Sequence, residues 1–137
     1  MGRKLARESA MKLLFQMGIN DDFSSESIDI FLNNNEFSID EREYIVDTIN
    51  NVVKNLEIID SKIEKYALGW KINRIPKVDL SILRIAIYEI LFRSDIPIEV
   101  SINEAIDISK KYSTNESSKF INGLLGSIAR DGNDLDD

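Results

Sequence analysis

Apolar residues recur along this chain at intervals of three and four positions, the spacing that places them on one face of a helix. Near the N-terminus the apolar set is Ala6, Ala10, Leu13, Leu14 and Met17. Comparable sets follow as far as Ile128, and only two prolines and six glycines occur in the whole chain to interrupt them. No segment alternates as a half-buried strand does. The pattern therefore predicts an all-α bundle of about seven helices.

Turn-forming residues and capping signals place the helix boundaries. Gly18 is predicted to end the first helix, and a second is expected over residues 25–33. A serine followed three residues later by a glutamate is the spacing of a capping box, in which each side chain satisfies a backbone N–H of the other residue. This spacing precedes three apolar patterns: Ser38 with Glu41, Ser101 with Glu104, and Ser113 with Glu116.

The helical pattern breaks around Gly69, and Pro76 then stands where a proline is tolerated in the first turn of a helix. We place a boundary there, between subdomains of about 1–69 and 70–130 within a single domain. The helix expected over residues 77–93 is apolar on nearly all sides, so it should lie at the centre of the bundle.

Composition narrows the classes of function. The chain of 137 residues contains no cysteine and no histidine, which removes disulfides, thiolate metal sites and the commonest general base. We find no phosphate-binding glycine loop and no calcium-loop spacing, so we expect no enzyme, cofactor or metal. No apolar run approaches the roughly 20 residues that cross a membrane, and we identify no signal peptide, which predicts a cytoplasmic protein.

Charge is distributed unevenly. The whole chain carries −7, whereas residues 1–17 carry four cations against one acid, a net +3. A positive helix in an acidic protein indicates a phosphate-bearing partner, although such cations also occur on ordinary solvated surfaces. Four aspartates fall within residues 131–137, which we predict to be a disordered acidic tail.

A second group of cations lies near the start of the last helix. Lys110, Lys111 and Lys119 are interleaved with Tyr112 and Phe120. This combination suits single-stranded RNA, because aromatic rings stack on unpaired bases while ammonium groups hold phosphates. Phe120 also fits the apolar stripe of its helix, so a core position remains an alternative.

Two acids interrupt the apolar central helix. We expect Asp79 and Glu89 to be exposed beside apolar surface, where they could receive a basic protein partner. For Asp79 a simpler interpretation is available, since an acid in the first turn complements the helix dipole without any partner.

Three segments resemble the NusB family of transcription antitermination factors, in the same order along the chain. They are residues 3–16, beginning RKLARESA; residues 78–89, VDLSILRIAIYE; and residues 102–125, ending FINGLL. The resemblance implies an all-helical, non-enzymatic protein. It also implies binding of single-stranded boxA RNA from ribosomal RNA leaders together with NusE, a small-subunit ribosomal protein, within the antitermination complex on RNA polymerase.

The resemblance further implies roles by position. The RNA-binding residues would be Arg3, Lys4, Arg7, Lys110, Tyr112, Ser113, Glu116, Lys119 and Phe120. The residues facing NusE would be Asp79 and Glu89. Glu116 would accept a hydrogen bond from a base amino group, because a carboxylate near RNA otherwise repels phosphate.

Two other functions remain open. A helical domain of this kind also occurs at the N-terminus of some ribosomal RNA methyltransferases, but no strand-rich cofactor segment is found in this chain. Alternatively, the protein is an adaptor between proteins, whose central helix docks a basic partner without RNA.

Overall fold

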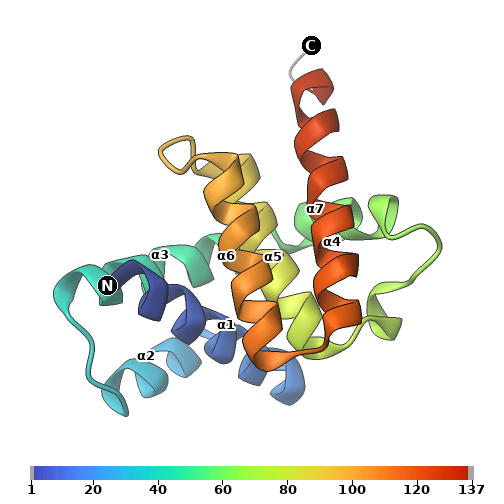
Figure 1. Ribbon diagram of the computed structural model, residues 1–137. Coiled ribbons are helices and arrows are strands. Elements are labelled where there is room, and N and C mark those ends of the chain that lie inside the picture. The colour runs from blue at the N-terminus through green and yellow to red at the C-terminus, as the bar shows by residue number, and fades with distance from the viewer. Residues whose placement is uncertain (1, 136–137) are drawn as a thin grey trace.

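Seven α-helices and one short 3-10 helix make up the described part of the chain, which contains no strand (Figure 1). The computed structural model describes residues 2–135, and side chains as far as Asp131. The α-helices are α1 Gly2–Asn20, α2 Ser25–Asn33, α3 Ile39–Lys54, α4 Leu56–Tyr66, α5 Lys77–Phe92, α6 Ile98–Tyr112 and α7 Asn115–Leu135; the 3-10 helix is η1 Ile72–Arg74. The all-α prediction is confirmed.

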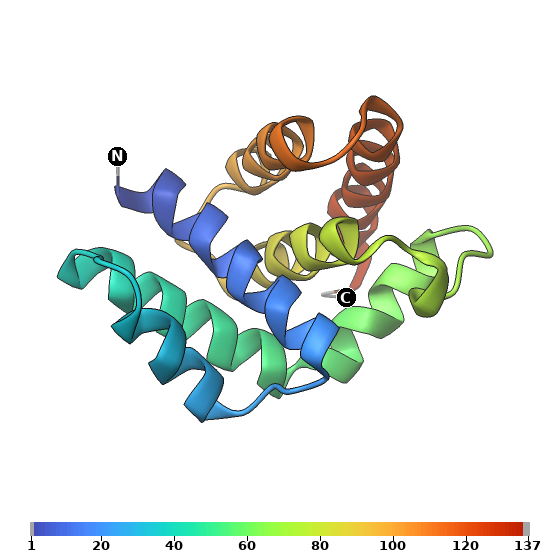
Figure 2. The same ribbon diagram turned by 90° about the horizontal axis from the view of Figure 1, so that it is seen from below.

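The central position expected for α5 is also confirmed. It packs against α1, α3, α4, α6 and α7, and Figures 1 and 2 show it surrounded by them. Every residue of α5 from Asp79 to Glu89 is buried, which matches its apolar sequence. Buried side chains from both predicted subdomains join one hydrophobic core, so α5 supplies a common centre to the two halves.

A buried polar cluster joins four helices near the C-terminal end of α5. Glu89 accepts hydrogen bonds from Nε and Nη2 of Arg7 in α1, at 2.9 and 3.1 Å. It also accepts from the hydroxyl of Ser101 in α6, at 2.7 Å, and from the hydroxyl of Tyr44 in α3. We call Arg7, Tyr44, Glu89 and Ser101 the Glu89 cluster.

Electrostatics explain why every charged group of the Glu89 cluster has a partner. The Glu89 side chain is 1% exposed and that of Arg7 is 6% exposed, so neither charge could be buried alone without a large desolvation cost. The two-pronged ion pair compensates both charges. Burial and the negative charge of Glu89 raise the pKa of Tyr44, which keeps its phenol protonated as a donor.

Asp79 is the second buried acid of α5, with 2% of its surface exposed. Its two carboxylate oxygens accept from the hydroxyls of Ser113 and Ser117, at 2.7 and 2.6 Å. These serines stand on either side of the start of α7, so Asp79 ties the first turn of α5 to the turn between α6 and α7. The expectation that Asp79 and Glu89 are exposed is therefore wrong, because both hold helices together from inside.

One capping box is confirmed. Ser38 accepts from the backbone N–H of Glu41 at 3.2 Å, and the Glu41 carboxylate accepts from the N–H of Ser38 at 2.8 Å. The box predicted at Ser101 is wrong, since α6 already begins at Ile98 and the Ser101 hydroxyl lies inside it, bonded to Glu89.

The box predicted at Ser113 is displaced by one residue. The hydroxyl of Thr114 accepts from the backbone N–H of Ser117 at 3.0 Å and so caps α7. Ser113 instead donates its hydroxyl to Asp79. Both misplaced boxes have one cause: a buried carboxylate takes the serine hydroxyl that the local spacing assigned to a helix end.

Two helix ends extend beyond their predicted limits. α1 continues through Gly18 to Asn20, and α7 continues to Leu135. Residues 131–135 are therefore helical, contrary to the predicted disordered tail, while residues 136–137 lie outside the described residues. Once a helix is formed, each added residue gains a backbone hydrogen bond, and no proline occurs in this stretch to oppose it.

The Glu89 cluster predicts a large stability effect at a single position. Glu89→Gln should lower the free energy of unfolding by about 3–5 kcal/mol, because the buried Arg7 guanidinium loses its two-pronged partner and, among the described residues, keeps only the carboxylate of Glu104, at 3.7 Å. Urea denaturation followed by circular dichroism measures the loss. Glu99→Gln, at an exposed site on α6, is the control and should cost within about 0.5 kcal/mol. Equal losses in the two variants would contradict the interpretation.

Candidate nucleic-acid interface

Long charged side chains bridge α1 and α6. Near the start of α1, Lys4 Nζ lies 3.4 Å from a carboxylate oxygen of Glu104 and 3.5 Å from one of Asp107, both on α6. The attraction of Glu104, with a smaller contribution from Asp107, raises the pKa of Lys4. The Lys4 side chain is nevertheless 57% exposed. Its ammonium group is therefore paired with acids and still accessible to solvent.

The bridge continues one turn further along both helices. Glu8 of α1 accepts from Lys111 Nζ at 2.9 Å and from the hydroxyl of Tyr112 at 2.8 Å. Burial opposes ionisation of Glu8, but the hydrogen bonds from Lys111 and Tyr112 outweigh it, and the pKa of Glu8 is lowered. We call the residues that make these contacts the α1–α6 seam: Lys4, Glu8, Glu104, Asp107, Lys111 and Tyr112.

The two arginines of α1 lie in different surroundings. Arg3 is exposed, with its guanidinium carbon 4.7 Å from the ring centroid of Tyr44. Arg7 is buried, bonded to Glu89, and its Nη1 lies 3.7 Å from Glu104. Arg3 is thus accessible to a phosphate, whereas the donors of Arg7 are already engaged. The structure corrects the expectation that Arg7 offers a free cation beside Arg3 and Lys4.

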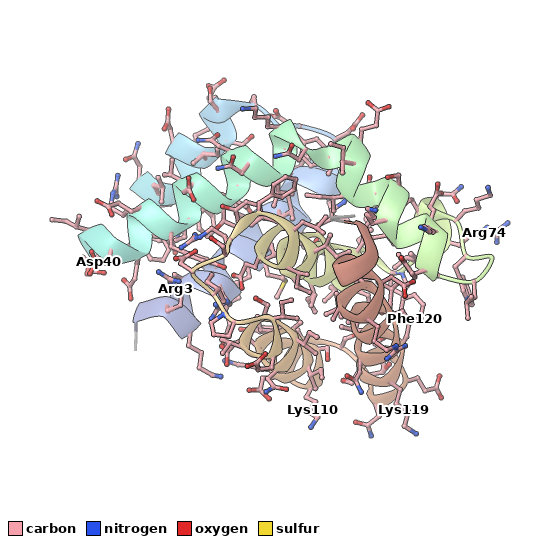
Figure 3. All side chains as sticks on the ribbon, turned by 90° about the horizontal axis from the view of Figure 1, so that it is seen from above. Arg3, Asp40, Arg74, Lys110, Lys119 and Phe120 are labelled. Atoms are coloured by element: carbon pink, nitrogen blue, oxygen red, sulfur yellow. The ribbon has the colours of Figure 1, made fainter. Side chains whose placement is uncertain are left out.

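The predicted residues of α6 and α7 also divide by exposure. Lys110, Glu116 and Lys119 are exposed, and Figure 3 shows Lys110 and Lys119 along one edge of the molecule, on neighbouring helices. Phe120 is half-buried and packs against the hydrophobic core, which favours its structural alternative. The hydroxyl of Ser113 is engaged by Asp79.

Tyr112 lies between two lysines. The Nζ atoms of Lys12 and Lys111 are each 5.3 Å from its ring centroid. Its hydroxyl is bonded to Glu8, so the ring is fixed at the junction of α1 and α6. This arrangement brings together the two cationic groups that the sequence placed about a hundred residues apart.

Sequence reasoning missed the acids of this surface. Glu104 was interpreted as a capping residue, and neither Asp107 nor Glu8 was singled out as a partner of a cation on another helix. Spacing along one helix reports neighbours three and four residues away, and these pairs join residues 100 or more apart in the chain. No local signal could have identified them.

A third cationic group lies in the connection between α4 and α5. Leu68, Trp70, Lys71 and Arg74 are all exposed there. The sequence held the signal for it, since a tryptophan between cations resembles the pattern noted near Tyr112. In Figure 3 Arg74 lies at the opposite end of the molecule from Arg3, so it provides a distant control site for tests of the α1–α6 surface.

Within the described residues, no group of three or more acidic or other metal-ligating side chains could hold a metal ion. None of the described helices is both long and apolar enough to cross a membrane.

These features define a small all-helical protein that presents cations from α1, α6 and α7 on its surface around a buried ionic centre. The model of the NusB family matches residues 4–130, which is nearly all of the described chain. The chain belongs to the NusB family.

Individual relatives agree with this assignment. The transcription antitermination protein NusB of Acetivibrio thermocellus is 50% identical over 130 residues, which cover 95% of this chain and 90% of the relative. Among solved structures, NusB of T. maritima superposes with a TM-score of 0.85 at 38% identity, covering 93% of this chain and 90% of that one. A crystal structure of antitermination factors NusB and NusE in complex with dsRNA gives a TM-score of 0.85 at 28% identity, with coverages of 94% and 96%.

The lowered pKa of Glu8 predicts an acid-sensitive seam. A carboxyl whose pKa is lower in the folded state stabilises the fold above its unfolded pKa, and this stabilisation is lost as the pH falls through the folded value. The wild type should therefore lose more unfolding free energy than Glu8→Gln between pH 7 and about pH 3. Urea denaturation at a series of pH values measures both curves. Parallel curves would show that Glu8 contributes no such stabilisation.

Proposed function

We propose that this protein is an RNA-binding transcription antitermination factor. It binds boxA-type single-stranded RNA of ribosomal RNA leaders together with NusE, and helps to assemble the antitermination complex on RNA polymerase. The observation that carries the proposal is the membership of the NusB family over residues 4–130, combined with a cationic surface built from α1, α6 and α7.

The related complex supports both partners. The structure that contains NusB, NusE and dsRNA matches 94% of this chain at a TM-score of 0.85. The RNA in that complex is double-stranded, whereas exposed cations beside Tyr112 suit an unpaired strand. Comparing single- and double-stranded RNA is therefore part of the test.

The proposed RNA contacts follow the exposure of each side chain. Arg3, Lys4, Lys110 and Lys119 hold phosphates, and Glu116 accepts from a base amino group. Arg7, Tyr112, Ser113 and Phe120 act as positioning residues, since their polar atoms or rings are engaged within the protein. Asp79 and Glu89 serve the partner NusE indirectly, by fixing the helices around α5.

We further propose that the protein performs no catalysis and acts in the cytoplasm, where nascent ribosomal RNA is made. The adaptor hypothesis has one observation in its favour, the exposed Leu68 and Trp70 between α4 and α5. It predicts that assembly with NusE does not depend on the cations of α1, α6 and α7. The experiment below separates the two.

Removal of exposed cations should weaken RNA binding in a position-dependent manner. Lys110→Ala combined with Lys119→Ala should reduce the affinity for a labelled boxA-type RNA, and Arg74→Ala should leave it nearly unchanged. Fluorescence anisotropy with and without NusE measures both. Four phosphate contacts to a single strand give a slope of about −2.8 in log K against log salt, and each lost contact makes the slope shallower by about 0.7.

The outcomes distinguish the hypotheses. Weaker binding in the double variant, with a shallower salt slope, supports direct RNA contact. The adaptor hypothesis would be favoured if the wild type bound NusE but no RNA, and if the double variant bound NusE as well as the wild type does. Equal weakening by Arg74→Ala would show that only total charge matters. Arg7→Ala is unsuited to this test, because it also removes the partner of buried Glu89.

A further inference from the structure

Lys4 is an exposed cation that does not stand free. Its ammonium lies within 3.5 Å of carboxylate oxygens from both Glu104 and Asp107. An RNA phosphate that binds Lys4 must compete with these two carboxylates for its ammonium group. The three groups therefore form a competition site, in which protein acid and nucleic-acid phosphate share one cation.

We propose that Glu104 and Asp107 together limit the RNA affinity of this surface by competing with phosphate for Lys4. This inference rests on the proposed RNA-binding function and adds residues that limit it. When phosphate takes Lys4, the carboxylate of Asp107 is left without its cation and next to a like charge. The contact with phosphate therefore competes with the two ion pairs that Lys4 makes with Glu104 and Asp107.

The exchange has a consequence for salt dependence. Log affinity falls with log salt because cations of a protein release the counterions condensed on phosphates. A carboxylate that loses its lysine attracts a cation from solution, so the net release at Lys4 is smaller than for an unpaired lysine. Removing one of the two carboxylates should restore part of that release.

Glu104 and Asp107 are not equally suitable for a substitution that tests this competition. Glu104 also lies 3.7 Å from Nη1 of Arg7, and its side chain is 20% exposed, so changing it disturbs the Glu89 cluster. The side chain of Asp107 is 55% exposed, and among the described residues its ion pair is with Lys4. Asp107→Asn therefore removes one of the two carboxylates that hold Lys4, while leaving the buried contacts in place.

The experiment compares Asp107→Asn with Glu99→Gln. Both variants remove one exposed acid from α6, but Glu99 lies in its first turn and pairs with no cation among the described residues. The full chain is titrated against labelled boxA-type single-stranded RNA at a series of salt concentrations. Asp107→Asn should bind about two- to five-fold more tightly than Glu99→Gln at low salt, as the modest energy of exposed ion pairs implies. Its salt slope should be steeper by up to about 0.7.

A double-variant cycle assigns the effect to Lys4. In a Lys4→Ala background the gain from Asp107→Asn should disappear, because no cation remains for the two anions to share. Equal affinities of Asp107→Asn and Glu99→Gln would overturn the proposal, as would a gain that survives in the Lys4→Ala background. Absence of RNA binding by the wild type under all conditions would instead reject the proposed function, and with it this inference. Circular dichroism of each variant confirms that folding is unchanged.

Discussion

The burial of Glu89 is the constraint on which the rest of the structure depends. A carboxylate inside a helical core requires a cation and further donors, and here they come from three other helices: Arg7 of α1, Tyr44 of α3 and Ser101 of α6. Satisfying this one charge therefore fixes the position of α1 and α6 around α5. The α1–α6 seam is formed by the same two helices. The geometry of its surface cations therefore depends on the buried ion pair that positions α1 and α6.

The same principle explains why a cationic surface can exist in an acidic protein. The cations near the seam differ in how far nearby acids neutralise their charge. Arg7 is in a buried ion pair and Lys4 in an exposed one, whereas Lys110 and Lys119 are exposed at the edge of the molecule. Local charge available to a phosphate is therefore smaller than the count of basic residues suggests. What the surface offers depends on which acids the neighbouring helix places within reach.

The sequence predicted the elements better than their connections. Helical spacing identified the seven helices, and the apolar run of residues 77–93 correctly predicted that α5 is central. The resemblance of three segments identified the family, which the match over residues 4–130 confirmed. The misplaced capping boxes at Ser101 and Ser113 show where local reasoning failed, because each hydroxyl bonds a buried acid of α5 that lies 12 or 34 residues away, beyond the reach of a capping pattern.

Periodicity and composition by themselves determined the helical class, the central helix and the presence of cations at two places in the chain, since these depend on neighbours within a few residues. Only the tertiary structure decided which of those cations are free. Arg3 and Arg7 are alike in sequence, four residues apart on one helix, yet one is exposed and the other buried against Glu89. The difference arises from partners on α3, α5 and α6, and electrostatic energy depends on distances in space that the order of residues does not specify.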